Sequence, residues 1–173
     1  MIYYVYALIV FILDQITKRL VVVYMEEYES RSVIGDFFML TSHRNRGAAF
    51  GILQNQRWFF IIATTIVVIG IVWYLQKLRK SGEPKKLLKT ALGLLLGGAI
   101  GNFLDRALFG EVVDFMHFHF EFSLLGADVD YDFAIFNLAD SAIVIGVALI
   151  FLDSLLVWRK ERRGLAHEHQ DQA

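Results

Sequence analysis

The chain has 173 residues, of which 56% are hydrophobic, and it holds one proline and no cysteine. This apolar share exceeds what a soluble domain of this size can bury, so we expect most of its surface to face lipid. Without cysteine there is no disulfide, no thiolate nucleophile and no cysteine-based metal site. A net charge of −1 and the lack of a basic stripe give no sign of nucleic-acid binding, and we expect no nucleic-acid partner.

Apolar stretches long enough to cross a hydrocarbon core of about 30 Å as helices occur at four places. Charged residues interrupt the first stretch at Asp14 and Lys18, and it lacks the basic start of a secretory signal peptide. Four residues apart on a helix, Asp14 and Lys18 can pair, and both a structural salt bridge and a role in a site stay open. The predicted spans are residues 2–23, 58–75, 87–104 and 138–158.

Lysine and arginine cluster between the second and third spans and again after the fourth. The positive-inside rule therefore places both clusters, and with them both termini, in the cytoplasm. Residues 24–56 and 107–136 would then lie outside, where we expect a small β-rich or interfacial element. The fold class is all-α membrane protein with one domain over residues 1–163, followed by a polar, disordered tail over residues 164–173.

The third span has two neighbouring faces of different character. Glycines recur at every fourth position from Gly93 to Gly101, which predicts close packing against another helix. Gly98, Asn102 and Asp105 follow a neighbouring face, and Arg106 comes four residues after Asn102. A polar stripe at the outer end of a glycine-seamed span predicts the lining of a site.

Carboxylates stand at two further places among apolar neighbours. Asp140 lies at the start of the fourth span, with Asn137 one helical turn before it. A carboxylate at the edge of an apolar segment is costly to keep ionised, so it is either paired or functional, although a helix N-cap is the simpler alternative. Asp114 is a second such residue, in the loop that we expect after the third span.

Two patterns in the second outer segment, one with histidines and one with aspartates, are poor candidates for metal sites. His117 to Glu121 alternate with aromatic residues, which describes a half-buried strand better than a set of metal ligands. Asp128 to Asp132 are similar to the start of a calcium-binding loop. However, Phe133 stands where that loop needs glycine, and Ala139 stands where it needs a bidentate glutamate.

The predicted topology brings polar residues together at the outer ends of the spans. Two carboxylates in a dehydrated place cannot both ionise, so one acts as an acid while the other acts as a base toward water. That is the chemistry of an aspartic peptidase. The converging residues are Asn45, Asn102, Asp105, Asp114, Asn137 and Asp140.

Five motifs occur together and in order, and with them the chain resembles the bacterial lipoprotein signal peptidases, also called type II signal peptidases. The resemblance covers about residues 10 to 145 and includes the four-span layout. The motifs are Asp14-Gln15-x-Thr17-Lys18, Asn45-x-Gly47-Ala48-Ala49-Phe50, Gly101-Asn102-x-x-Asp105-Arg106, Val112-Val113-Asp114-Phe115 and Phe136-Asn137-x-Ala139-Asp140-Ser141.

The resemblance implies an aspartic endopeptidase of the bacterial inner or plasma membrane, with its active site near the extracytoplasmic face. Such enzymes remove the signal peptide of a prolipoprotein just before the cysteine that bears diacylglycerol. It implies Asp114 and Asp140 as the catalytic pair, no metal or cofactor, contact with membrane lipids, sensitivity to globomycin-type inhibitors, and a monomer. The residues that would shape the site or hold substrate are Asp14, Lys18, Asn45, Gly98, Asn102, Asp105, Arg106, Asn137 and Ala139.

The sequence departs from the family pattern in two places. Ala134 stands where the family usually has proline, and the stretch between the two catalytic positions is longer, with residues 121–132 as the insertion. That insertion would form either a lid or a tolerated surface loop.

Two questions stay open at this level. Asp105 rivals Asp114 as the second catalytic carboxylate, although the neighbouring Arg106 favours a structural ion pair for Asp105. Alternative functions are a small transporter or channel with a proton relay, and a scaffold subunit without activity. A relay needs ionisable groups through the whole membrane depth, whereas the second and fourth predicted spans are free of them over most of their length.

Overall fold

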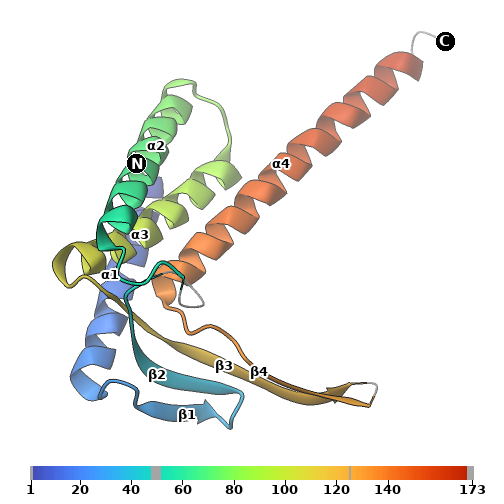
Figure 1. The fold of residues 1–173 in the computed structure, drawn as a ribbon. Helices are drawn as coiled ribbons and strands as arrows, with labels where there is room; N and C mark the ends of the chain where they lie inside the picture. The colour runs from blue at the N-terminus through green and yellow to red at the C-terminus, as the bar shows by residue number, and fades with distance from the viewer. Residues whose placement is uncertain (1, 48–51, 125, 171–173) are drawn as a thin grey trace.

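The computed structural model describes residues 2–47, 52–124 and 126–170. α1, α2 and α3 lie together, α4 starts beside them and then runs away from α1 and α2, and an antiparallel sheet lies across the end of the bundle where α4 starts (Figure 1). The elements are α1 (Ile2–Tyr24), β1 (Ser30–Ile34), β2 (Phe38–Asn45), α2 (Arg57–Lys80), α3 (Lys86–Leu108), β3 (Val112–Leu124), β4 (Ala127–Asp132) and α4 (Leu138–Gln170).

Three helices in the described part of the chain are long and apolar enough to cross a membrane, namely α2, α3 and α4 up to Arg163. They match three of the predicted spans, so a multi-pass membrane protein is confirmed. α1 has 23 residues, but Asp14, Lys18 and Arg19 lower the apolar character of its second half. The first predicted span, residues 2–23, therefore stays a prediction.

Glycines bring α3 into close contact with two helices. A Cβ atom on Gly93 would lie 2.6 Å from the carbonyl oxygen of Tyr3, and one on Gly97 would lie 2.5 Å from that of Ala7, both on α1. A Cβ atom on Gly98 would collide with the carbonyl oxygen of Ala139 on α4. The predicted glycine seam thus packs against α1, and Gly98, on the neighbouring face, packs against α4.

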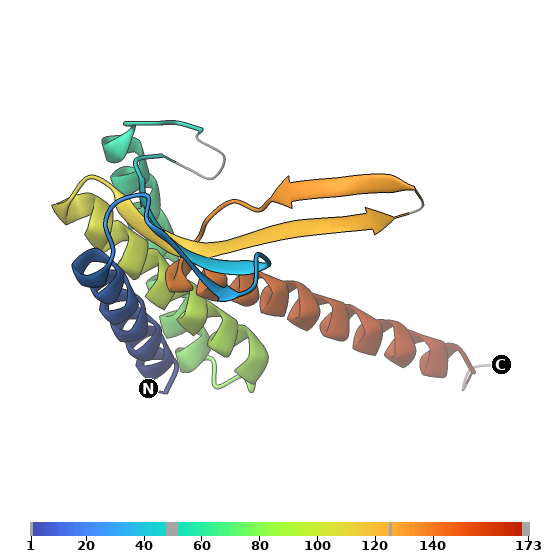
Figure 2. The same ribbon diagram turned by 90° about the horizontal axis from the view of Figure 1, so that it is seen from below.

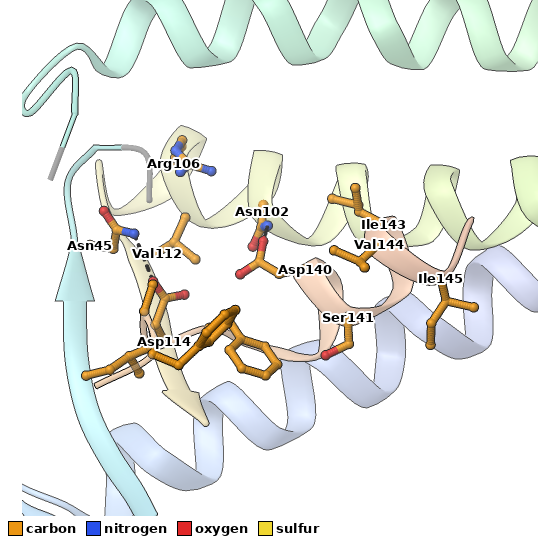
Figure 3. A pocket seen from close by; sticks show the side chains of 14 residues that line it. Asn45, Asn102, Arg106, Val112, Asp114, Asp140, Ser141, Ile143, Val144 and Ile145 are labelled. Carbon is orange, nitrogen blue, oxygen red and sulfur yellow. Dashed lines mark hydrogen bonds between the residues drawn. The ribbon is translucent and has the colours of Figure 1, made fainter. Parts of the chain in front are cut away.

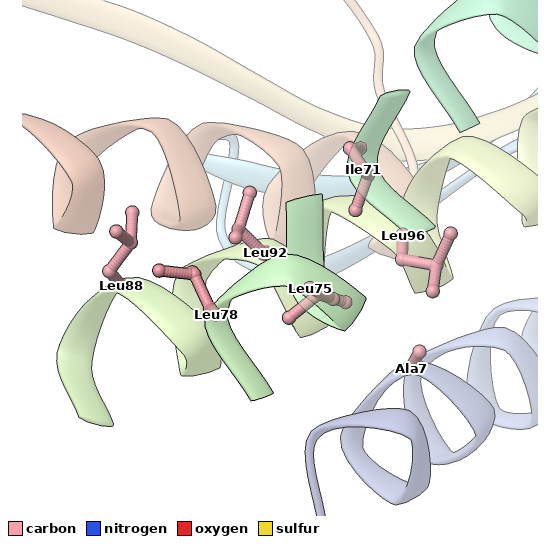
Figure 4. Close-up of a cluster of buried hydrophobic side chains, with 7 residues drawn as sticks. All are labelled: Ala7, Ile71, Leu75, Leu78, Leu88, Leu92 and Leu96. Atoms are coloured by element: carbon pink, nitrogen blue, oxygen red, sulfur yellow. The ribbon is translucent and has the colours of Figure 1, made fainter. Parts of the chain in front are cut away.

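Leucines hold α2 against α3 at the end of the bundle that lies away from the sheet (Figure 4). Most of the remaining surface of α2 is apolar and exposed, as expected for a helix in lipid. The buried cluster consists of Ala7, Ile71, Leu75, Leu78, Leu88, Leu92 and Leu96.

The sheet has the strand order β1-β2-β3-β4, with every neighbouring pair antiparallel. β1 and β2 confirm the small β-rich element that we expect within residues 24–56. Asp114 lies on β3, where it pairs with His43 of β2, and not in the loop that we expect. The reason is that Val112, Val113 and Asp114 find partners on β2, which only the folded chain brings beside them.

Residues 121–124 and 127–132, which lie in the stretch that we expect to be an insertion, pair in the β3–β4 hairpin, which points away from α1, α2 and α3 (Figure 2). His117 and His119 lie on β3, which confirms the predicted strand, and each has a ring nitrogen within 3.0 Å of Asp132 Oδ1. The Asp132 side chain is exposed, and its hydrogen bond with His119 raises the pKa of His119. The cluster is a hydrogen-bonded contact between the two histidines and Asp132 on the hairpin.

α4 continues beyond the predicted fourth span to Gln170. No proline in this stretch ends the helix, and the disorder that we expect over residues 164–173 stays a prediction. Residues 171–173 lie outside the described residues.

Candidate active site

Backbone pairing places the start of α4 beside β3. The N–H of Met116 donates to the carbonyl oxygen of Phe136 at 2.8 Å, and the N–H of Phe136 donates to that of Met116 at 3.1 Å. Asp114 on β3 and Asp140 in the first turn of α4 therefore line the same cavity, which has a volume of about 560 Å³ (Figure 3). The two carboxylates that the motifs predict as a pair do converge.

Asn137 and Asp140 cap the first turn of α4 reciprocally. The N–H of Asp140 donates to Asn137 Oδ1 at 2.9 Å, and the N–H of Asn137 donates to Asp140 Oδ2 at 3.2 Å. Asn137 is thus the N-cap, and Asp140 stands three residues later, as in a capping box. The alternative that Asp140 itself is the N-cap is therefore wrong, because Asn137 has that position. The cap uses Asp140 Oδ2, so Oδ1 can accept a hydrogen bond from another partner.

Asp114 is almost completely buried, with 2% of its surface exposed. Its Oδ2 accepts a hydrogen bond from Asn45 Nδ2 at 2.9 Å, and its Oδ1 accepts one from Asn137 Nδ2 at 2.7 Å. Burial, and after it the charge of Asp140, raises the pKa of Asp114 to about 7. This carboxyl group can therefore hold a proton near neutral pH.

Asp140 is supported from α3 and α1. Asn102 Nδ2 donates to Asp140 Oδ1 at 2.7 Å, and Lys18 Nζ donates to Asn102 Oδ1 at 2.9 Å. Lys18 also forms ion pairs with Asp14 at 2.8 Å and with Asp105 at 2.7 Å, and all these side chains are buried. The predicted pairing of Asp14 with Lys18 is present, next to the site.

Asp105 differs from our expectation in its partner. It pairs with Lys18 of α1 and accepts a hydrogen bond from Gln15 at 3.0 Å, whereas Arg106 points elsewhere. Arg106 donates to the carbonyl oxygen of Gly47 at 2.9 Å and lies over the ring of Phe60. Adjacent residues on a helix point in different directions, which explains the error. Asp105 does not line the cavity, so as a rival to Asp114 it has no geometric support.

The other predicted site residues divide into two groups. Asn45, Asn102 and Arg106 line the cavity with the two aspartates. Behind them lies a supporting layer, in which Asp14 Oδ1 accepts the N–H of Ala139 at 3.0 Å. The remaining members of that layer are Lys18, Gly98, Asp105 and Asn137.

The apolar walls of the cavity are the part that sequence reasoning missed. Ile143 and Val144 follow Asp140 by three and four residues, so helical periodicity could have indicated them. The opposite wall comes from the irregular segment before α4, which carries no periodic signal. Its lining residues are Phe133, Ala134, Ile135 and Phe136.

The cavity combines two carboxylates, amide donors and apolar walls. In the residues that the structure describes, no group of three histidine or acidic side chains has the arrangement of a metal site. A carboxylate pair of this kind, with one member holding a proton, can activate a water molecule against a carbonyl carbon.

The family model described as "Signal peptidase (SPase) II" matches residues 6–156. A lipoprotein signal peptidase of Brevibacillus brevis is 53% identical over 160 residues, which cover 92% of this chain and 99% of that protein. One from Bacillus pumilus is 50% identical over 162 residues, which cover 94% of this chain and 97% of that protein.

A solved structure described as a bacterial membrane enzyme has a similar fold. It is 42% identical in sequence, superimposes with a TM-score of 0.75, and the match covers 88% of this chain and 87% of that one. A second such structure gives 42% identity and a TM-score of 0.72. Together with the family model and the sequence relatives, these matches establish that the chain belongs to the signal peptidase II family.

Proposed function

We propose that this protein is an aspartic endopeptidase that removes signal peptides from prolipoproteins, cutting before a cysteine that already carries diacylglycerol. The observation that carries this function is the placement of Asp114 and Asp140 on one apolar-walled cavity, each held by amide donors. We infer the class of substrate from the family membership and the type of reaction from the chemistry of the cavity.

In the proposed mechanism Asp114 and Asp140 share one proton. The ionised carboxylate takes a proton from water while the water oxygen attacks the scissile carbonyl carbon, and the protonated carboxyl group donates its proton to the carbonyl oxygen. The resulting gem-diol then breaks its C–N bond. The leaving nitrogen takes the proton gained from water, and a gem-diol hydroxyl returns its proton to the other carboxylate, so the pair ends with one proton again.

Four spans with both termini in the cytoplasm form the proposed topology. The outward face of α1 carries exposed apolar side chains such as Leu8, Ile12 and Ile16, which suits contact with lipid even though its inward face is charged. Lys77, Arg79 and Lys80 end α2 at the pole opposite the sheet. The positive-inside rule then favours the sheet and the cavity on the extracytoplasmic face of a bacterial plasma membrane.

Residues 1–163 would act as one domain and as a monomer. The signal helix of the substrate would lie in the bilayer beside Ile143 and Val144, and the diacylglyceryl chains would stay among membrane lipids. A globomycin-type cyclic peptide is proposed to inhibit by occupying the same cavity.

Cleavage of a purified diacylglyceryl-modified prolipoprotein, followed by gel shift, tests the function. We expect the wild type to cut, and we expect Asp114→Asn and Asp140→Asn to remain folded but inactive. Asp36→Asn is the matched control, because Asp36 is an exposed carboxylate in the β1–β2 turn. A wild-type protein that does not cut, or an Asp114→Asn protein that does, would contradict the proposal.

A further inference from the structure

Two asparagine side chains beside the catalytic pair are locked in one orientation. Asn45 Oδ1 accepts the N–H of Gly47 at 2.9 Å, and Asn137 Oδ1 accepts the N–H of Asp140 at 2.9 Å. A backbone N–H can only donate, so each amide must present its oxygen there and its NH2 group elsewhere. Both NH2 groups consequently point at Asp114.

The third asparagine is locked by Lys18. The ammonium has no lone pair, so Asn102 Oδ1 must be the acceptor of the 2.9 Å contact with Lys18 Nζ. Asn102 Nδ2 is therefore the group that donates to Asp140 Oδ1 at 2.7 Å. The positive charge of Lys18 reaches Asp140 through a polarised amide.

The two aspartates consequently differ in how well they hold a negative charge. Asp140 accepts the amide backed by the ammonium, and it also accepts a backbone N–H in the first turn of α4, where the helix dipole favours an anion. Asp114 lies on a strand, and in the described part of the chain its hydrogen-bond donors are two neutral amides, those of Asn45 and Asn137.

We propose that Lys18 is a positioning residue which, through Asn102, keeps Asp140 as the ionised member of the pair and leaves the shared proton on Asp114. The inference rests on the proposed function. It assigns Asp140 as the base that takes a proton from water and Asp114 as the acid that protonates the carbonyl oxygen.

Lys18 is placed for this role by its own contacts. Its ammonium lies within 2.9 Å of three oxygens, as many as it has N–H donors. The charged groups that surround the pair are Asp14 and Lys18 from α1, Asp105 and Arg106 from α3, and the two aspartates themselves.

Kinetic variants of the full-length protein test this relay. Lys18→Gln removes the charge but keeps an amide donor, and Asn102→Ala removes the relay while leaving the ion pairs of Lys18 intact. Arg19→Gln is the matched control, since Arg19 is an exposed cation next to Lys18. Thermal unfolding in detergent shows which variants are folded. If Lys18→Gln is not folded, Asn102→Ala alone tests the inference.

For Lys18→Gln and Asn102→Ala we expect kcat for prolipoprotein cleavage to fall on the order of 100-fold, with little change in KM. The acid limb of the pH–rate profile should move to higher pH in both, because ionised Asp140 has lost its support. The double variant should lose no more than Asn102→Ala alone, because the two residues act through one contact. Arg19→Gln should change neither kcat nor the profile.

Losses that multiply in the double variant would show that Lys18 acts independently of Asn102. A lower kcat with an unmoved acid limb would reduce both residues to a structural role. Either result overturns the inference while the wild type still cuts, whereas a wild type that does not cut contradicts the proposed function itself.

Discussion

Replacing Asp114 with asparagine should change how the stability of the protein depends on pH. The carboxyl group of Asp114 is buried, and its pKa rises from an ordinary value of 3.8 to about 7 in the folded chain. Between these two values the folded protein holds a proton that the unfolded chain has released. The stability that Asp114 contributes is therefore fully present below about pH 4 and is lost as the pH rises through 7.

The size of the effect follows from the shift. About three pKa units correspond to roughly 4 kcal/mol at 1.36 kcal/mol per unit. Asparagine has the shape of the protonated side chain but does not titrate, so the variant lacks this dependence. From pH 4 to pH 7 the unfolding midpoint of Asp114→Asn should rise relative to the wild type by roughly 10 °C, at about 2–4 °C per kcal/mol.

Thermal unfolding in detergent, followed by tryptophan fluorescence from pH 4 to pH 7.5, measures this difference. Asp36→Asn serves again as the control, and its midpoint should follow that of the wild type throughout. A difference between Asp114→Asn and the wild type that stays constant with pH would refute the reasoning, because it would mean that Asp114 is ionised in the folded protein over the whole range.

Three further outcomes are expected. In wild-type cleavage kinetics, kcat/KM should fall above about pH 7 as free enzyme loses the proton of Asp114. Asn45→Ala should move that alkaline limb to higher pH, because the hydrogen bond from Asn45 lowers the pKa of Asp114; an unmoved limb would contradict this role. Gly97→Leu should lower the unfolding midpoint, since a Cβ atom there would lie 2.5 Å from the carbonyl oxygen of Ala7, whereas Gly70→Leu, with no atom within 4 Å, should not. Equal midpoints for the two glycine variants would disprove the packing argument.

Local patterns in the sequence carry much of this fold. Apolar runs and clusters of basic residues predict α2, α3 and α4, because a helix that crosses a membrane needs a long and mainly apolar stretch. The glycines of α3 predict close helix packing, because only residues without a side chain let two backbones approach this closely. Both signals lie within one segment, so they can be read without knowing what that segment touches.

The proposed catalytic pair is a different case. Asp114 and Asp140 stand out as carboxylates among apolar neighbours, but their pairing came mainly from the order of the family motifs. In the structure the pairing depends on backbone hydrogen bonds between Met116 and Phe136, which join a strand to the segment before a helix. Such a bridge leaves no periodic trace in the sequence.

By itself, the sequence determined the apolar spans, the glycine seam, the identities of the acidic and amide residues, and the family. Only the tertiary structure decided that Asp105 pairs with Lys18 and not with Arg106, and that Asp114 lies on a strand. It also decided that Phe133 and Ile143 form part of the cavity walls. The physical reason is the distance along the chain over which each signal acts. Hydropathy and periodicity report which face of a single helix or strand is apolar. Ion pairs, hydrogen-bond direction and burial depend instead on how elements distant in sequence are packed together.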